Sequence, residues 1–192
     1  QETARVERTR AGHMALATLG EEFLTTTGDT VSLSELQGEG KIIAIYFSAH
    51  WCPPCRSFTP MWAKTYMALK DAGKPIECIF VSSDRSAGEF QNYFATMPWL
   101  AIPHGDKRVA ELKKRFKVEG IPTLVLLNGA TGSVITTDGR RCVMADPKGA
   151  GMPFPASSKE QVAGIKDALK QPAKKPSFLA RMLRGSRAAA GA

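Results

Sequence analysis

The sequence contains no long hydrophobic run and few cysteines. No stretch of 18 or more apolar residues occurs in its 192 residues, so no membrane-spanning helix is expected. Four cysteines are too few for a secreted disulfide scaffold, which would be shorter and denser in cysteine. A hydrophobic content of 43% and a charged content of 23% are ordinary for a globular protein, and the length suits one domain with appendages.

The basic excess lies mainly at the chain ends. Of the net charge of +8, residues 171–192 supply five basic side chains and no acid, and residues 1–14 supply a net charge of +1. The residues between them are therefore almost neutral. Basic and aromatic side chains are not interleaved anywhere in the chain, so we expect no nucleic-acid partner.

The four cysteines include one close pair. Cys52 and Cys55 are separated by two residues, whereas Cys78 and Cys142 stand alone. A zinc ribbon needs a second close pair, and His50 would add only a third ligand to the first pair. A structural zinc module is thus the weaker alternative. We expect a redox-active disulfide without a metal or another cofactor, in a reducing compartment such as the cytoplasm.

Composition divides the chain into three regions. Residues 1–13 have no apolar period and end just before Met14, so we interpret them as an artificial leader. Residues 14–170 are expected to form one domain, and a monomer is expected. Residues 171–192 are interpreted as a flexible basic tail. In the alternative, apolar tail residues at helical spacing touch an acidic membrane surface, for example that of an organelle.

Apolar patterns predict strands alternating with helices, which is typical of an α/β protein. Two short extended pieces are expected around residues 27–30, with Ser34 capping a brief helical turn after them, and residues 98–105 and 138–156 are predicted loops. The predicted strands are 41–47, 76–81, 123–127 and 133–137, and the predicted helices are 52–72, 86–97, 106–115 and 157–170. This order favours a central mixed β-sheet, parallel at its centre and flanked by helices on both faces.

The close cysteine pair lies where a predicted strand turns into a predicted helix. At a helix start, unpaired backbone N–H groups and the helix dipole favour negative charge, so the pKa of Cys52 should fall below the ~8.5 of a free thiol. The thiolate would attack a substrate disulfide, and Cys55 would then attack Cys52 and release the reduced substrate. Pro53 and Pro54 fit the first helical turn and reduce the number of N–H donors near the sulfur.

Three further residues are candidates for contacting the substrate. Trp51 is expected either to shield the sulfur with a flat contact surface or to lie in the core. The Ile121-Pro122 bond precedes a predicted strand and is a candidate for a cis peptide. If it faces the cysteines, the Ile121 backbone can pair with an extended substrate peptide.

Arg56, Tyr46 and Asp84 are candidates for tuning the cysteine pair. Arg56 either stabilises the thiolate or is a solvated helix residue. Tyr46 either hydrogen-bonds near the sulfurs or belongs to the core. Asp84 follows the second predicted buried strand, and it either moves protons at the site or caps a turn.

The run WCPPCR at residues 51–56, followed by MPWLAIP and GIPTL, resembles the tryparedoxin–nucleoredoxin branch of the thioredoxin superfamily. The resemblance extends from about residue 23 to residue 154 and implies a thioredoxin-like fold. It maps the exposed nucleophile onto Cys52, the resolving cysteine onto Cys55 and the cis proline onto Pro122. Two positions depart from the pattern: Tyr46 replaces the buried aspartate of thioredoxins, and Arg85 stands where tryparedoxins tend to carry an acid.

The resemblance also implies an activity. It implies that electrons pass from a low-molecular-weight dithiol such as trypanothione, or from a reductase, to peroxiredoxins and other protein disulfides. The alternative is a nucleoredoxin-like binding module, in which the pair senses oxidation and gates a partner.

Overall fold

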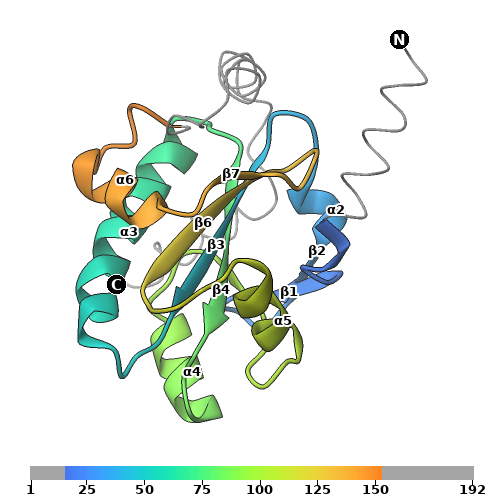
Figure 1. Cartoon of the computed structure of the whole chain (residues 1–192), viewed down its shortest axis with the longest axis vertical. Coiled ribbons are helices and arrows are strands. Elements are labelled where there is room, and N and C mark those ends of the chain that lie inside the picture. The colour runs from blue at the N-terminus through green and yellow to red at the C-terminus, as the bar shows by residue number, and fades with distance from the viewer. Residues whose placement is uncertain (1–15, 153–192) are drawn as a thin grey trace, which may run out of the picture.

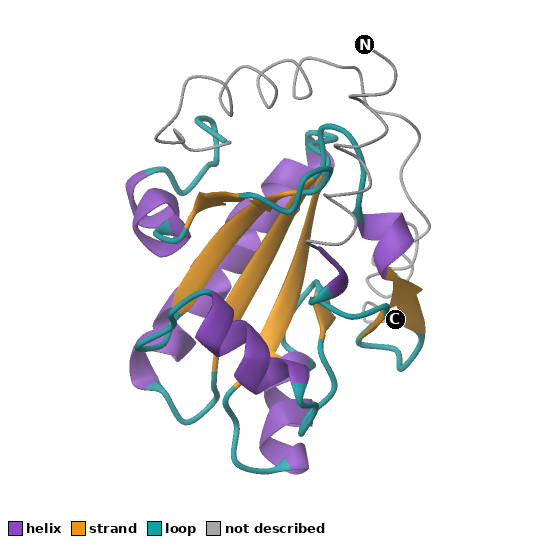
Figure 2. Cartoon of the chain, turned by 45° about the vertical axis from the view of Figure 1, so that its right-hand side comes forward, coloured by secondary structure: helices purple, strands orange, loops and turns teal. Residues whose placement is uncertain are grey.

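A computed structural model describes residues 16–152 as one seven-stranded mixed sheet with helices on both faces (Figure 1 and Figure 2). The strands are β1 (Glu22–Leu24), β2 (Thr30–Ser32), β3 (Ile42–Ser48), β4 (Ile76–Ser82), β5 (Leu100–Ala101), β6 (Thr123–Asn128) and β7 (Val134–Thr136). The helices are α2 (Leu33–Leu36), α3 (Pro53–Asp71), α4 (Ala87–Phe94), α5 (Arg108–Arg115) and α6 (Gly139–Ala145). The interpretations of residues 1–13, 157–170 and 171–192 concern parts of the chain outside the described residues.

The centre of the sheet is parallel, as the sequence predicts. The strand order is β2-β1-β5-β4-β3-β6-β7, and β3 and β4 pair in parallel from Ile42↔Ile76 to Ser48↔Ser82. Every residue of β3 is buried, which is why its sequence is a continuous apolar run rather than an alternating one. The hairpin of β6 and β7 joins β3 in antiparallel pairing.

Alternate residues of β3 pack against different helix layers. Ile42, Ala44 and Tyr46 belong to a buried cluster that includes side chains from α3, α4 and α6. Ile43, Ile45 and Phe47 belong to a second cluster on the other face, with side chains from α2 and α5. The predicted α/β fold with helices on both faces of a mixed sheet is therefore confirmed, and the sheet is enclosed between two apolar layers. None of the helices within residues 16–152 has the length and apolar character needed to cross a membrane.

Three predictions of secondary structure were wrong. The predicted loop 138–156 contains α6, and the predicted loop 98–105 contains the short strand β5. Helix α6 begins at Gly139, where an added Cβ would lie 2.8 Å from the carbonyl oxygen of Leu124. Glycine weakens a helical pattern in the sequence, but here it permits close packing against β6. The first short helix is capped by Ser32 instead of Ser34, with the Ser32 N–H donating to Glu35 Oε1 at 3.2 Å.

Candidate active site

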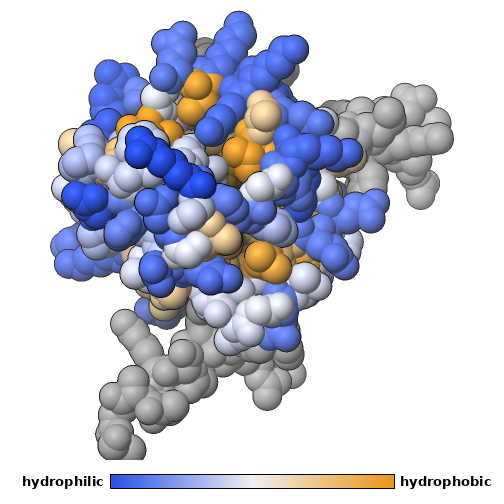
Figure 3. Space-filling view, turned by 90° about the horizontal axis from the view of Figure 1, so that it is seen from below, coloured by the Kyte–Doolittle hydropathy of each residue, from blue (hydrophilic) through white to orange (hydrophobic). Residues whose placement is uncertain are grey.

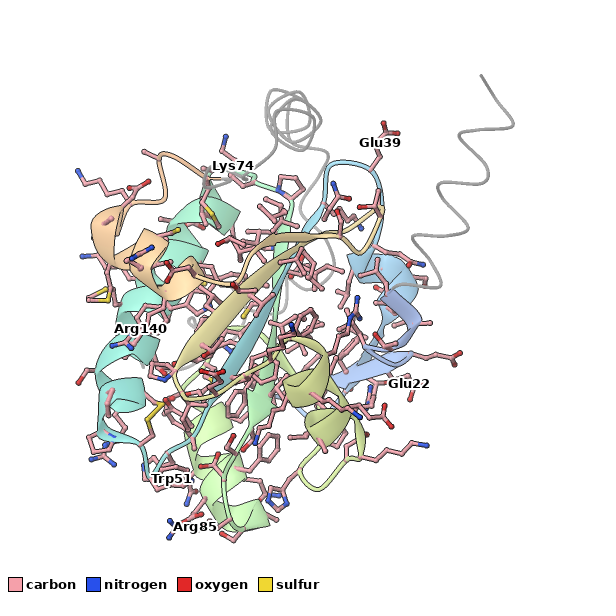
Figure 4. All side chains as sticks on the ribbon, in the orientation of Figure 1. Glu22, Glu39, Trp51, Lys74, Arg85 and Arg140 are labelled. Carbon is pink, nitrogen blue, oxygen red and sulfur yellow. A yellow bond between two sulfur atoms is a disulfide. The ribbon has the colours of Figure 1, made fainter. Side chains whose placement is uncertain are left out.

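The cysteine pair lies where β3 and β4 both end. Because these strands are parallel and in register, the loops that follow Ser48 and Ser82 come together at one edge of the sheet. The Ser83 N–H donates to the Ser48 carbonyl at 2.9 Å and joins the two loops. Figure 4 shows Trp51, from the first loop, and Arg85, from the second, close together at the lower end of the molecule.

Cys52 is the N-cap residue of α3. Its Sγ accepts a hydrogen bond from the Cys55 N–H at 3.3 Å. Pro53 and Pro54 occupy the first two helical positions and have no N–H, so the Cys55 amide is the first donor of the helix. The sulfur therefore sits at the positive end of the helix dipole, where negative charge is favoured.

Cys52 and Cys55 form a disulfide, with their Cα atoms 5.2 Å apart. Cys55 is fully buried, and Cys52 is 4% exposed. In this oxidised state the expected nucleophile is therefore less exposed than the resemblance implies, because Ala49 and Ile121 pack around it. Of the two half-cystines, Cys52 is still the one that reaches the surface.

The predicted substrate-pairing segment lies against the disulfide. The Ile121-Pro122 bond is cis, and Cys52 Sγ lies 3.7 Å from the Ile121 carbonyl oxygen. Beside it is an open groove of about 620 Å³. The groove is lined by residues 116–123, together with Thr137 and Arg140. A polypeptide that approached the disulfide could therefore lie along this segment.

Trp51 stands at the rim of the site and not in the core. It is 41% exposed, and its indole N–H donates to the Ser83 carbonyl at 2.9 Å. The Arg85 guanidinium lies over the indole ring, 5.2 Å from its centroid, at cation–π distance. The ring is thus fixed by the β4 loop and keeps a face available to a partner.

Asp84 and Arg56 hold the loop that precedes Cys52. The buried Asp84 carboxylate accepts the His50 N–H at 2.6 Å and the Ser82 hydroxyl at 2.7 Å. Arg56 Nη1 donates to the His50 carbonyl at 2.8 Å. Both polar backbone groups of His50 are therefore bonded to charged side chains, which fixes the turn between β3 and α3.

Tyr46 belongs to the core, the second of the two expectations for it. It is fully buried, and its hydroxyl shares a hydrogen bond of 2.7 Å with Thr59 Oγ1. Thr59 in turn bonds to the Tyr93 hydroxyl at 2.5 Å, and Tyr93 bonds to Ser48 at 3.1 Å. Burial raises the pKa of Tyr46, so its hydroxyl keeps its proton at neutral pH. No sequence pattern indicates this network, because its bonded pairs are up to 45 residues apart.

The other two cysteines lie outside the site. Cys78 is fully buried in β4 and accepts the Trp62 indole N–H at 3.4 Å, and burial raises its pKa well above that of a free thiol. Cys142 is partly exposed on α6, and partial burial followed by the charge of Asp138 raises its pKa. Neither thiol is activated as a nucleophile. Among residues 16–152 there is no group of three or more His, Cys, Asp or Glu side chains that could hold a metal ion.

Several known proteins are similar in sequence to this chain. A thioredoxin-like family profile matches residues 40–134. Tryparedoxin of Trypanosoma brucei brucei is 44% identical over 134 residues, which cover 69% of this chain and 90% of that protein. Nucleoredoxin of Bos taurus is 45% identical over 133 residues, which cover 69% of this chain but 30% of that protein. The chain spans less than a third of the length of the nucleoredoxins that it matches.

A solved structure superposes on the described fold. Tryparedoxin II complexed with glutathionylspermidine has a TM-score of 0.69 and 37% sequence identity, with 73% of this chain and 99% of that chain covered. The similarity therefore includes nearly the whole of a tryparedoxin.

Replacing Asp84 by alanine should loosen the loop before Cys52. Loss of the carboxylate leaves the His50 N–H without its partner, and a hydrogen bond to a charged group contributes about 1.5–3 kcal/mol. Asp84→Asn keeps an oxygen acceptor and should be less destabilised. Urea unfolding of the oxidised proteins measures the difference, and equal midpoints for wild type and Asp84→Ala would contradict this role.

The free thiols should differ in reactivity. In the oxidised protein at neutral pH, N-ethylmaleimide should label Cys142 slowly and leave Cys78 unlabelled, because Cys78 is fully buried. After denaturation both should react. Mass spectrometry of the digested protein locates the label. Labelling of native Cys78 as fast as that of Cys142 would contradict the packing of β4.

Proposed function

The chain belongs to the thioredoxin-like family, together with the tryparedoxins and nucleoredoxins, and from this premise we propose that it reduces protein disulfides. It is a thioredoxin-like oxidoreductase with a Cys52–Cys55 disulfide. The observation that supports the proposal most strongly is the hydrogen bond from the Cys55 N–H to Cys52 Sγ at the start of α3. In the reduced protein this donor and the helix dipole stabilise a Cys52 thiolate, the attacking species in disulfide exchange.

The reductive half of the proposed cycle is a two-electron transfer. The Cys52 thiolate attacks one sulfur of a substrate disulfide, forms a mixed disulfide and releases the other substrate sulfur as a thiolate, which takes a proton from water. Cys55 then loses its proton and attacks Cys52 Sγ. The mixed disulfide breaks, the second substrate sulfur leaves as a thiolate, and the Cys52–Cys55 disulfide forms. The substrate gains two electrons and the protein loses two.

A dithiol donor completes the cycle. One donor thiolate attacks the Cys52–Cys55 disulfide, and the second donor thiol resolves the mixed disulfide. The products are an oxidised donor and two protein thiols. A dithiol of the trypanothione type is the donor that the family resemblance implies, and peroxiredoxin disulfides are the implied acceptors. We place this activity in the cytoplasm, where low-molecular-weight thiols keep such a pair reduced.

Substrate binding is proposed to use the segments on either side of the disulfide. On one side, the Ile121 backbone beside Pro122 lies against Cys52 Sγ and is positioned to pair with an extended peptide. On the other side, Trp51 offers an exposed aromatic face. Pro53 and Pro54, at the start of α3, are also exposed. A substrate disulfide would reach Cys52 between these surfaces.

Arg56 and Asp84 are proposed to be positioning residues. Both are bonded to the backbone of His50, two residues before the nucleophile, and the two side chains carry charges of opposite sign. Together they set the direction from which Cys52 enters the helix. Tyr46 contributes less directly, through the buried network that joins β3 to α3 and α4.

Single substitutions of the two cysteines should have different effects. Cys52→Ser should abolish the reduction of insulin or peroxiredoxin disulfides, because the attacking sulfur is lost. Cys55→Ser should accumulate mixed disulfides with the substrate, because the resolving sulfur is lost. Cys142→Ser is the matched control and should turn over like wild type. Insulin turbidity with dithiothreitol as donor, and non-reducing electrophoresis, measure these outcomes.

Normal insulin reduction by Cys52→Ser would overturn the proposal. Slow cycling by wild type, with a partner bound in only one redox state, would instead favour the redox-sensing module. That result is distinct, because a sensor needs no rapid turnover.

A further inference from the structure

We propose that the surface around the disulfide selects protein disulfides whose neighbouring residues are acidic. The inference rests on the proposed function and specifies its substrate class. The occupant is an extended peptide segment that carries carboxylates beside its disulfide. Cations on both sides of Cys52 make this surface complementary in charge to such a segment.

The first cation lies on the Trp51 side. The exposed Arg85 guanidinium stacks on the indole ring, and the ring is held in turn by the Ser83 carbonyl. Within residues 16–152, the ion pairs do not include Arg85. Glu89 is near in sequence, but its Oε2 accepts the Arg85 backbone N–H at 3.0 Å. The guanidinium is thus oriented by an aromatic face, and its N–H donors are available to a carboxylate.

The second group of cations lies on the Ile121 side. Lys117 and Arg140 line the groove beside the Ile121-Pro122 segment, and both are exposed. Glu119 is the one acid among the lining residues, so the groove has an excess of positive charge. Neither cation takes part in an ion pair between residues 16 and 152. The neighbouring Arg141 differs, because it pairs with Asp138 at 2.6 Å.

Charged side chains on an exposed rim of this kind act mainly on the rate at which an oppositely charged partner associates. Complementary potentials raise the association rate of a charged partner and suppress partners of the same sign, and salt weakens both effects. The buried carboxylate of Asp84 is turned inward to His50 and Ser82 and does not face a partner. Seen from below, the end of the molecule that carries Trp51 and Arg85 is mainly hydrophilic with small apolar patches (Figure 3 and Figure 4). This suits a polar, extended segment better than a large apolar one.

Three model peptides test the proposal. Each is dimerised through one disulfide, and they differ only in the residues that flank the cysteine, which are Glu, Lys or Ser. The full chain is the catalyst, with dithiothreitol as donor. The kcat/KM for each peptide is divided by the rate constant for reduction of that peptide by dithiothreitol alone. This normalisation is needed because flanking charge changes the intrinsic reactivity of a disulfide. Arg85→Glu and Arg140→Glu are the test variants, and Arg141→Glu is the matched control on α6.

Wild type should favour the Glu peptide over the Lys peptide by about tenfold at low ionic strength, and added salt should remove most of this preference. Arg85→Glu and Arg140→Glu should each lower the ratio about three- to tenfold, while Arg141→Glu should leave it within about twofold. Equal normalised rates for all three peptides would overturn the inference and leave the proposed function standing. An equal ratio of the Glu-peptide rate to the Lys-peptide rate in Arg85→Glu and Arg141→Glu would do the same. No turnover of the Ser peptide by wild type would overturn both.

Discussion

The hydrogen bond from the Cys55 N–H to Cys52 Sγ is the interaction on which the chemistry of this chain depends. It exists because two prolines without N–H groups begin α3, so the first amide donor of the helix meets the sulfur. The rest of the fold brings the sulfur to that point. Strand β3 is buried on both faces, and Asp84, in the loop after β4, holds the backbone just before Cys52. The site is therefore a junction of two strand ends and one helix start.

Much of the fold could be predicted because its strongest signals are local. Strand β3 is a continuous apolar run, and α3 repeats Phe58, Trp62, Tyr66 and Leu69 at helical spacing, so both were identified from the sequence. The alternation of strands and helices was enough to predict the parallel centre. Cys52 and Cys55 could be identified because two residues in a fixed local spacing carry the chemistry. That spacing can be recognised in the sequence without knowledge of the fold.

The contacts that complete the site could not be predicted, because they join residues far apart in the chain. The Trp51 indole meets the Ser83 carbonyl and the His50 N–H meets Asp84, across separations of 32 and 34 residues. No periodicity reports such pairs. Helix α6 was missed for a related reason, since Gly139 reads as a loop residue until its close approach to β6 is known. The sequence likewise left open whether Trp51 was a rim or a core residue. Its position at the rim depends on the loop after β4, whose Ser83 carbonyl accepts the indole N–H.

The measurement that tests this account most directly is a pH titration of Cys52 in the reduced protein, followed by thiolate absorbance, with Cys52→Ser as the blank. The helix start and the Cys55 amide stabilise the anion, so the account predicts a pKa for Cys52 below the value of about 8.5 found in a free cysteine. Replacing Pro53 and Pro54 by other residues should shift the pKa of Cys52, because the replacement changes the backbone N–H donors around the sulfur. A Cys52 that ionises at or above the pKa of free cysteine would contradict the central claim.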